Sequence, residues 1–126
     1  MSTNLKRVGI YNRWLATLGG GEKTSLGIAE YLSRYYPVEV ISHQKVSKDM
    51  AGERLNLDLS RVQFTTVPDR SVLQLPAITR NYDLFIDASH LDYFPSYAPL
   101  SALLVFFPAK LTLQNNVRRW IKSIFR

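Results

Sequence analysis

The sequence predicts an α/β fold, a Rossmann-like parallel sheet with helices on both faces. Short apolar segments rich in β-branched residues alternate along the chain with segments of helical periodicity. The strand-like segments are apolar almost throughout, as is typical of parallel strands covered on both faces. With 126 residues, 46% of them hydrophobic, residues 1–126 have the size of a single globular domain with its own core.

The first part of the chain is predicted to form one βαβ unit. A buried strand is expected at Lys6–Asn12, followed by a loop, Trp14–Gly21, that ends in three glycines. Apolar residues recur at helical spacing over Glu22–Tyr36, and Pro37 predicts the end of this helix. A second strand is expected at Val38–Ser42. Such units are right-handed and parallel, and they place ligands at the carboxyl ends of their strands.

The second part of the chain continues the alternation. Residues 45–59 are expected to form a loop with a short helix, and residues 70–81 a short helix interrupted at Pro76. Three further strands are expected, at Val62–Val67, Leu84–Ile86 and Ala102–Phe107. A five-stranded sheet that ends on a helix without a terminator indicates a truncated domain.

The tail carries most of the net charge of +6. Eleven Lys and Arg residues face ten acidic residues before position 110, whereas all five charged residues from Lys110 onward are basic. Over residues 115–126 the apolar side chains recur at i, i+3, i+4, i+7 and i+8, which predicts a basic amphipathic helix. These side chains are Val117, Trp120, Ile121, Ile124 and Phe125. Residues 116–126 either contact an anionic membrane surface or pack on the sheet.

Composition excludes several classes of protein. Without cysteine, the chain has no disulfide scaffold, thiolate zinc site or cysteine nucleophile, and no metal site is predicted. No segment resembles a signal peptide or a membrane span. No nucleic-acid partner is expected, because the basic patch is small and the other aromatic residues fall in predicted core strands. The expected location is the cytoplasm, with peripheral membrane contact open to the tail.

Three consecutive glycines stand between the first strand and the first helix: Gly19, Gly20 and Gly21. Glycines let a ligand approach the backbone, and a helix N-terminus attracts phosphate, although a plain flexible turn is the structural alternative. The turn is not a Walker A loop, because Lys23 follows Glu22 rather than glycine. Thr24 and Ser42 stand where a dinucleotide fingerprint needs glycine and an acid, so no NAD or other cofactor is expected.

The segment Gly19–Lys23 after a first strand resembles the GGxE or GGGE signature of the "group 1" retaining GT-B glycosyltransferases. The resemblance covers most of the chain. It implies the N-terminal, acceptor-side domain of an enzyme that transfers sugar from a nucleotide-sugar donor to a glycan or lipid-linked acceptor. Gly19, Gly20 and Gly21 would then lie near the donor diphosphate and stabilise the leaving group. A C-terminal donor-binding domain would complete the site, so the isolated chain is expected to be inactive.

Two further similarities to that family are weaker evidence for the resemblance. Phe106-Phe107-Pro108 follows the last expected strand where some relatives have His-Tyr-Pro or His-Phe-Pro, and here a phenylalanine replaces the histidine. Glu22 and Glu30 have the E-x7-E spacing of the family's donor-binding pair. Their place after the first strand makes that match coincidental. We expect Glu22 to complement the helix dipole and Glu30 to be a solvated helix residue.

The remaining candidate site residues lie in loops after the expected strands. Asp87 and His90 follow the fourth strand and are predicted as catalytic residues, with loop capping as the structural alternative. Trp14 and Asp92 are predicted to contact the acceptor, although Trp14 has core cover as its alternative. His43, after the second strand, receives less weight. The alternative function is a non-catalytic Rossmann-like module that binds a phosphorylated ligand or a membrane surface.

Overall fold

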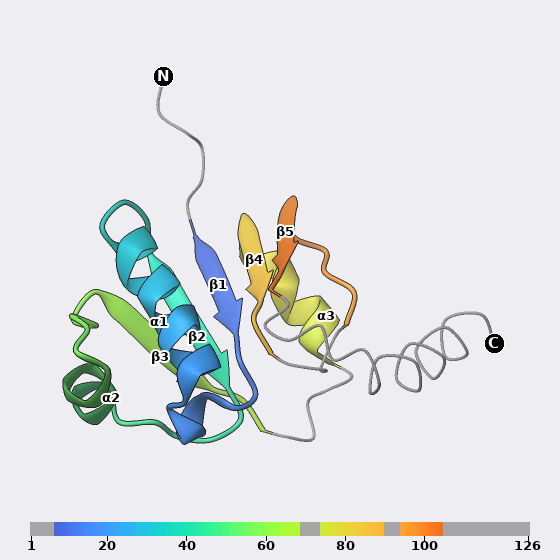
Figure 1. The fold of residues 1–126 in the computed structure, drawn as a ribbon. Coiled ribbons are helices and arrows are strands. Elements are labelled where there is room, and N and C mark those ends of the chain that lie inside the picture. Colours follow the sequence, from blue (N-terminus) through green and yellow to red (C-terminus); the bar gives the residue numbers. More distant parts are fainter. Residues whose placement is uncertain (1–6, 69–73, 90–93, 105–126) are drawn as a thin grey trace, which may run out of the picture.

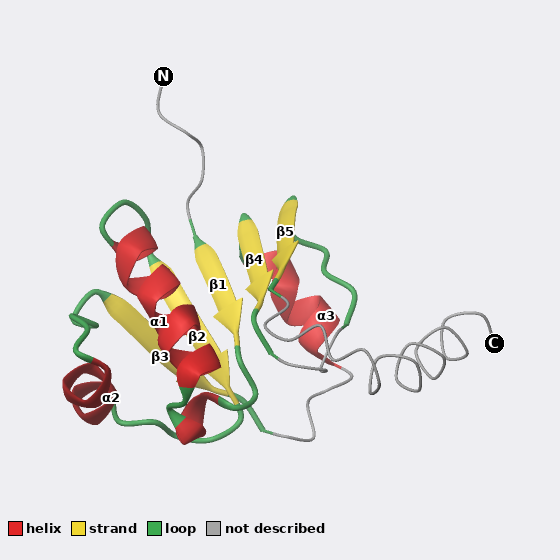
Figure 2. Ribbon diagram, viewed as in Figure 1, coloured by secondary structure: helices red, strands yellow, loops and turns green. Residues whose placement is uncertain are grey.

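The computed structural model describes residues 7–68, 74–89 and 94–104. Within these ranges the chain forms a five-stranded parallel sheet with helices on both faces, which confirms the predicted fold class (Figure 1). The strands are β1 (Val8–Tyr11), β2 (Val38–Ser42), β3 (Val62–Thr66), β4 (Leu84–Asp87) and β5 (Leu100–Leu103). The helices are α1 (Gly20–Ser33), α2 (Lys48–Leu55) and α3 (Leu75–Ile78), with short 3-10 turns at Leu15–Thr17 and Thr79–Asn81 (Figure 2).

The strand order is β3-β2-β1-β4-β5, which places β1 in the middle of the sheet. From β1 the chain winds outward through β2 to β3, then crosses back to β4 on the other side of β1. Tyr11, the last residue of β1, is therefore in register with Ile41 of β2 and with Asp87 of β4. The direction of winding reverses between β1 and β4, and open α/β sheets bind their ligands at the carboxyl side of such a reversal.

One face of the sheet is covered by α1 and α2. Alternate residues of the strands point to the same face, so Val8 and Ile10 of β1 pack beside Val38 and Val40 of β2. The helices contribute the other half of this apolar layer, namely Leu26 and Ala29 from α1 and Ala51 and Leu55 from α2. This layer is the main core and explains the helical spacing of apolar residues in α1.

The opposite face is covered by α3 and the segment around Phe94 and Ala98. Here the Tyr82 ring lies directly over Gly9 of β1, where an added Cβ would come within 2.8 Å of ring atoms. The Tyr82 hydroxyl donates to the Glu39 carboxylate, which also pairs with Arg7 at 3.0 Å. Burial raises the pKa of Tyr82, and the bond to Glu39 raises it further. Gly9 is therefore required by close aromatic packing rather than by a turn.

The first helix is shifted toward the N-terminus relative to the sequence prediction. It begins at Gly20 and ends at Ser33, instead of running over Glu22–Tyr36. Its end is early because Tyr36 precedes Pro37, and a residue before proline is disfavoured in helical conformation. The chain closes the helix with a turn in which the Tyr36 N–H donates to the Leu32 carbonyl at 2.9 Å.

Two later predictions also need correction. Pro76 lies in the first turn of α3, where its missing N–H leaves no intrahelical bond unmade, so it does not interrupt the helix. The last strand is Leu100–Leu103 rather than Ala102–Phe107, because its register is set by pairing Leu100 with Leu84. All four residues of β5 are exposed. No helix within the described ranges is long and apolar enough to cross a membrane.

Some predictions lie outside the described residues. These are the amphipathic helix over 115–126, the Phe106-Phe107-Pro108 segment, and the two loop residues His90 and Asp92. They remain predictions.

Candidate functional site

Buried polar side chains gather at the carboxyl ends of β1 and β4, where the winding reverses. Asn12 follows β1 and is 1% exposed; its Nδ2 donates to Ser25 Oγ of α1 at 3.1 Å. Its Oδ1 accepts from the Trp14 backbone N–H at 2.8 Å. One buried amide thus fixes the loop after β1 against the first helix. The predicted first strand, Lys6–Asn12, included Asn12, whereas β1 ends at Tyr11, so Asn12 is a site residue that the sequence prediction missed.

Trp14 lies in the same loop, held by Asn12, with 47% of its surface exposed. Leu15, its neighbour, is fully buried and carries the loop's contact with the core. One alternative for Trp14 was that it covers the core. In the structure the neighbouring Leu15 fills this role instead. The Trp14 side chain is therefore about half exposed at the carboxyl edge.

The glycine turn begins α1. Gly19 is the N-cap residue and Gly20 the first helical residue, so Gly20 and Gly21 belong to the helix rather than to a loop. None of the glycines adopts a positive φ; the left-handed residue is Leu18, with φ of 51°. A Cβ added at Gly20 would meet no atom within 4 Å. The turn is therefore open above Gly20, and glycine there leaves the first-turn backbone accessible.

Glu22 occupies the third helical position, where a capping box places its acid. It is only 8% exposed, and its Oε2 lies 3.1 Å from the position that a Gly19 Cβ would take. The carboxylate is therefore folded back beside the helix N-terminus, as expected for a side chain that complements the dipole. An anion beside Gly19 would lie next to this carboxylate, whereas a Cβ at Gly20 would meet no atom within 4 Å.

The loop after β4 completes the group. Asp87 Oδ1 accepts from the Ser89 backbone N–H at 3.0 Å, and both residues are buried. Ser89 Oγ in turn accepts from the Arg13 backbone N–H at 3.0 Å, and so joins the loops after β1 and β4. The Asp87 carboxylate therefore caps its own turn, which was the structural alternative in the sequence analysis. Its predicted catalytic role stays a prediction.

His43, which received less weight in the sequence analysis, makes hydrogen bonds at the carboxyl ends of two other strands. Its Nδ1 lies 3.1 Å from the Val67 carbonyl oxygen, and its Nε2 lies 2.7 Å from the Tyr11 hydroxyl. A carbonyl only accepts, so Nδ1 donates to the Val67 oxygen, while the donor in the Tyr11–Nε2 bond depends on the protonation of the ring. This imidazole ties together the carboxyl ends of β1, β2 and β3. Sequence reasoning missed it because all three segments are far apart along the chain.

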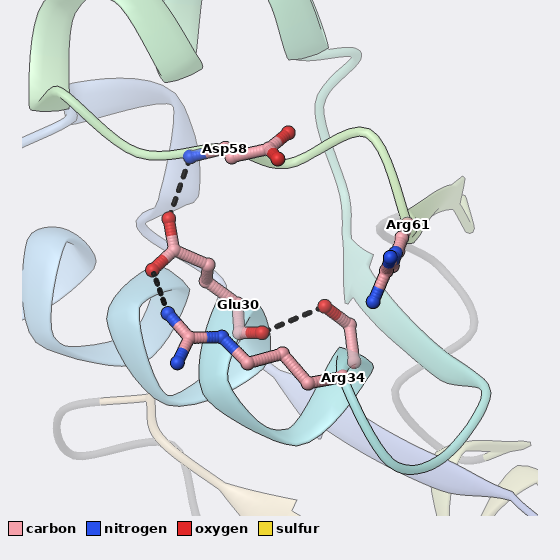
Figure 3. A pocket seen from close by; sticks show the side chains of 5 residues that line it. Glu30, Arg34, Asp58 and Arg61 are labelled. Carbon is pink, nitrogen blue, oxygen red and sulfur yellow. Dashed lines mark hydrogen bonds and ion pairs between the residues drawn. The ribbon is translucent and has the colours of Figure 1, made fainter.

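A surface cavity of about 280 Å³ lies at the other edge of the sheet, near the end of α1 (Figure 3). It is lined by Glu30, Ser33, Arg34, Asp58 and Arg61. The Glu30 carboxylate accepts from the Asp58 backbone N–H at 2.6 Å and pairs with Arg34 at 3.5 Å. Glu30 is thus bound and only partly exposed, not the solvated residue expected.

The cavity contains an ion pair between Glu30 and Arg34. Hydrogen bonds from Ser60 lower the pKa of Asp58, and the nearby Arg61 and Arg34 lower it further. The Glu30 carboxylate therefore joins the end of α1 to the loop before β3, through its ion pair with Arg34 and the hydrogen bond from the Asp58 N–H. Among the residues that the structure describes, no group of three His, Asp or Glu residues could hold a metal ion.

The comparisons with known proteins identify no family for this chain. A scan against protein-family models found no match, and a search of curated proteins found no relative. The glycosyltransferase resemblance therefore stays a prediction drawn from the sequence.

Proposed function

We propose that this chain is the acceptor-side domain of a GT-B-type glycosyltransferase, which moves a sugar from a nucleotide-sugar donor to a glycan or lipid-linked acceptor. The glycine signature supports the proposal, and so does its position at the reversal of winding. The observation that carries it is the bond between the Arg13 backbone and Ser89 Oγ. That bond brings the loop with Trp14 beside the loop after β4, at the edge where α/β sheets bind ligands.

The chemistry of this edge suits a sugar. An exposed indole such as Trp14 packs against the apolar face of a sugar ring, and carboxylates such as Glu22 accept bonds from its hydroxyl groups. The Glu22 carboxylate lies beside Gly19 and not within 4 Å of the position of a Gly20 Cβ, so it would meet hydroxyl donors on the Gly19 side of the turn. The acceptor is therefore assigned to the side of Trp14 and Glu22.

The donor diphosphate is assigned to the open surface above Gly20. Negative charge develops on the departing nucleoside diphosphate, and the N-terminus of α1 would stabilise it. In this scheme a second domain holds the rest of the donor. Transfer therefore needs both domains.

The test is an NMR titration of the full 126-residue chain with uridine diphosphate, followed by a neutral oligosaccharide. We expect the diphosphate to shift the amide signals of Gly20 and Gly21, and the saccharide to shift the indole N–H signal of Trp14. Gly20→Glu adds a carboxylate into open space and should weaken diphosphate binding at least tenfold. Gly27→Glu is the matched control, because a Cβ at Gly27 also meets no atom within 4 Å on the same helix.

Two outcomes would contradict the proposal. One is the absence of any response to either ligand at the carboxyl edge. The other is sugar transfer by this chain alone, which would show that it is more than the acceptor side.

A non-catalytic module that binds a phosphorylated ligand is the second candidate, and the open glycine turn at Gly20 favours it. Equal shifts of the Gly20 amide with inorganic phosphate and with uridine diphosphate, together with no response of Trp14 to saccharide, would support this candidate instead.

A further inference from the structure

Part of one sheet face is uncovered within the described ranges. Leu84 of β4 and Leu100 of β5 are register partners. They lie on the same face of the sheet that α1 covers at β1 and β2. Ala102 and Leu104 follow Leu100 on this face, because alternate strand residues point to the same side. Leu100 is 59% exposed and Ala102 is exposed, whereas Leu84 and Leu104 reach the main core. No described helix lies in front of β4 and β5 (Figure 1). These four residues are called the β4–β5 strip.

The sequence of this same chain contains a segment of matching character. Residues 115–126 place five apolar side chains along one side of a predicted helix, with Arg118, Arg119, Lys122 and Arg126 around the other. A stripe of this kind needs an apolar surface to cover it, and basic residues opposite the stripe suit contact with water.

We propose that residues 115–126 form a helix that packs its apolar stripe on the β4–β5 strip, with its basic side toward solvent. Ten residues, 105–114, connect Leu104 to this segment, and an extended linker of that length reaches about 35 Å. The helix would be about 18 Å long, and a four-residue strand is about 13 Å. The linker is therefore long enough for the segment to fold back along β4 and β5.

The intramolecular site is favoured over a membrane by effective concentration. A segment tethered ten residues from its docking surface is present there at a high local concentration without any partner. A membrane would compete for the same apolar side chains, so both cannot hold the helix at once. This inference is independent of the proposed glycosyltransferase function.

The test uses the fluorescence of Trp120 in the full chain carrying Trp14→Phe, which removes the other of the two tryptophans. We expect Trp120 to emit at shorter wavelength than in a free 115–126 peptide and to be protected from acrylamide. Adding Leu100→Asp should raise acrylamide quenching at least threefold. Leu103→Asp is the matched control: Leu103 is 52% exposed on the same strand but faces the other side, so quenching should stay unchanged.

Cross-linking provides a second measurement that does not depend on a charged substitution. The chain has no cysteine, so Leu100→Cys with Ile121→Cys creates one pair of thiols. A short bis-maleimide should join them within one chain, seen as a mass increase of a single linker. The pair Leu103→Cys with Ile121→Cys should react at least threefold less efficiently.

Three results would overturn the proposal. Trp120 quenching equal to that of the free peptide would show an undocked segment. Protection that rises with protein concentration would assign the β4–β5 strip to a second copy. Protection that appears only with phosphatidylserine vesicles would assign the segment to a membrane.

Discussion

The two edges of the sheet hold polar side chains in different ways. At the carboxyl edge Asn12, Asp87 and Ser89 are buried and bonded to backbone or to neutral side chains. At the amino edge Glu30 and Asp58 lie among arginines in a surface cavity, and Asp58 is exposed. Burying polar groups is costly unless each is bonded, whereas exposed ion pairs contribute little.

The difference shows that, of these two groups of polar side chains, the group at the carboxyl edge is the one that is buried at a cost in stability. A core of apolar side chains alone would need no buried amide after β1 and no buried serine after β4. Those groups hold two loops in fixed positions beside exposed Trp14. At the amino edge the cavity holds the Glu30–Arg34 ion pair at the surface. The carboxyl edge is therefore the better candidate site.

The largest expected effect is at the carboxyl edge. Asn12→Ala removes both bonds of a buried amide and leaves the Trp14 backbone N–H and Ser25 Oγ with fewer partners. We expect the free energy of unfolding to fall by about 2–3 kcal/mol in a urea titration. Asn81→Ala, at an exposed position, is the control and should cost no more than about 0.5 kcal/mol. Equal losses in the free energy of unfolding for the two variants would contradict the importance of the buried amide at the carboxyl edge.

A smaller effect is expected at the amino edge. Glu30→Gln keeps an oxygen that accepts from the Asp58 N–H but loses the charge that pairs with Arg34. The expected loss of stability is about 0.5–1 kcal/mol, and it should shrink in roughly 1 M salt because exposed charges are screened. Glu53→Gln, on the exposed side of α2, controls for the change in net charge. A loss of stability that does not depend on salt would mean that the Glu30 ion pair at the amino edge is buried like the polar groups at the carboxyl edge.

The smallest effect concerns the titration of Asp58. Its pKa is lowered from the ordinary value of 3.8, mainly by hydrogen bonds from Ser60. A lowered carboxyl pKa stabilises the fold above the ordinary value, and this contribution is lost as the pH falls through the lower folded value. Carbon NMR of the side-chain carboxyl should show Ser60→Ala raising the pKa toward 3.8. Ser101→Ala should leave it unchanged, and an unaltered pKa in Ser60→Ala would contradict the assigned cause.

Much of the fold was predictable because its signals are local. Strand composition and the helical spacing in α1 lie within short windows, and the handedness of βαβ units gives the parallel sheet. Boundaries were less predictable. β5 begins at Leu100 because Leu84 is its register partner, which is a contact between distant segments.

The candidate site was likewise predictable only in part from the sequence. The sequence by itself placed Gly19–Gly21, Trp14 and Asp87 after strands, and therefore at the carboxyl edge. Only the tertiary structure brought Arg13 to Ser89, which are 76 positions apart in the chain. The same holds for His43, whose bonds join three strands, and for Glu30, whose backbone partner is 28 positions away. Periodicity reports what each segment buries, whereas hydrogen bonds between loops depend on strand order, which no short window contains.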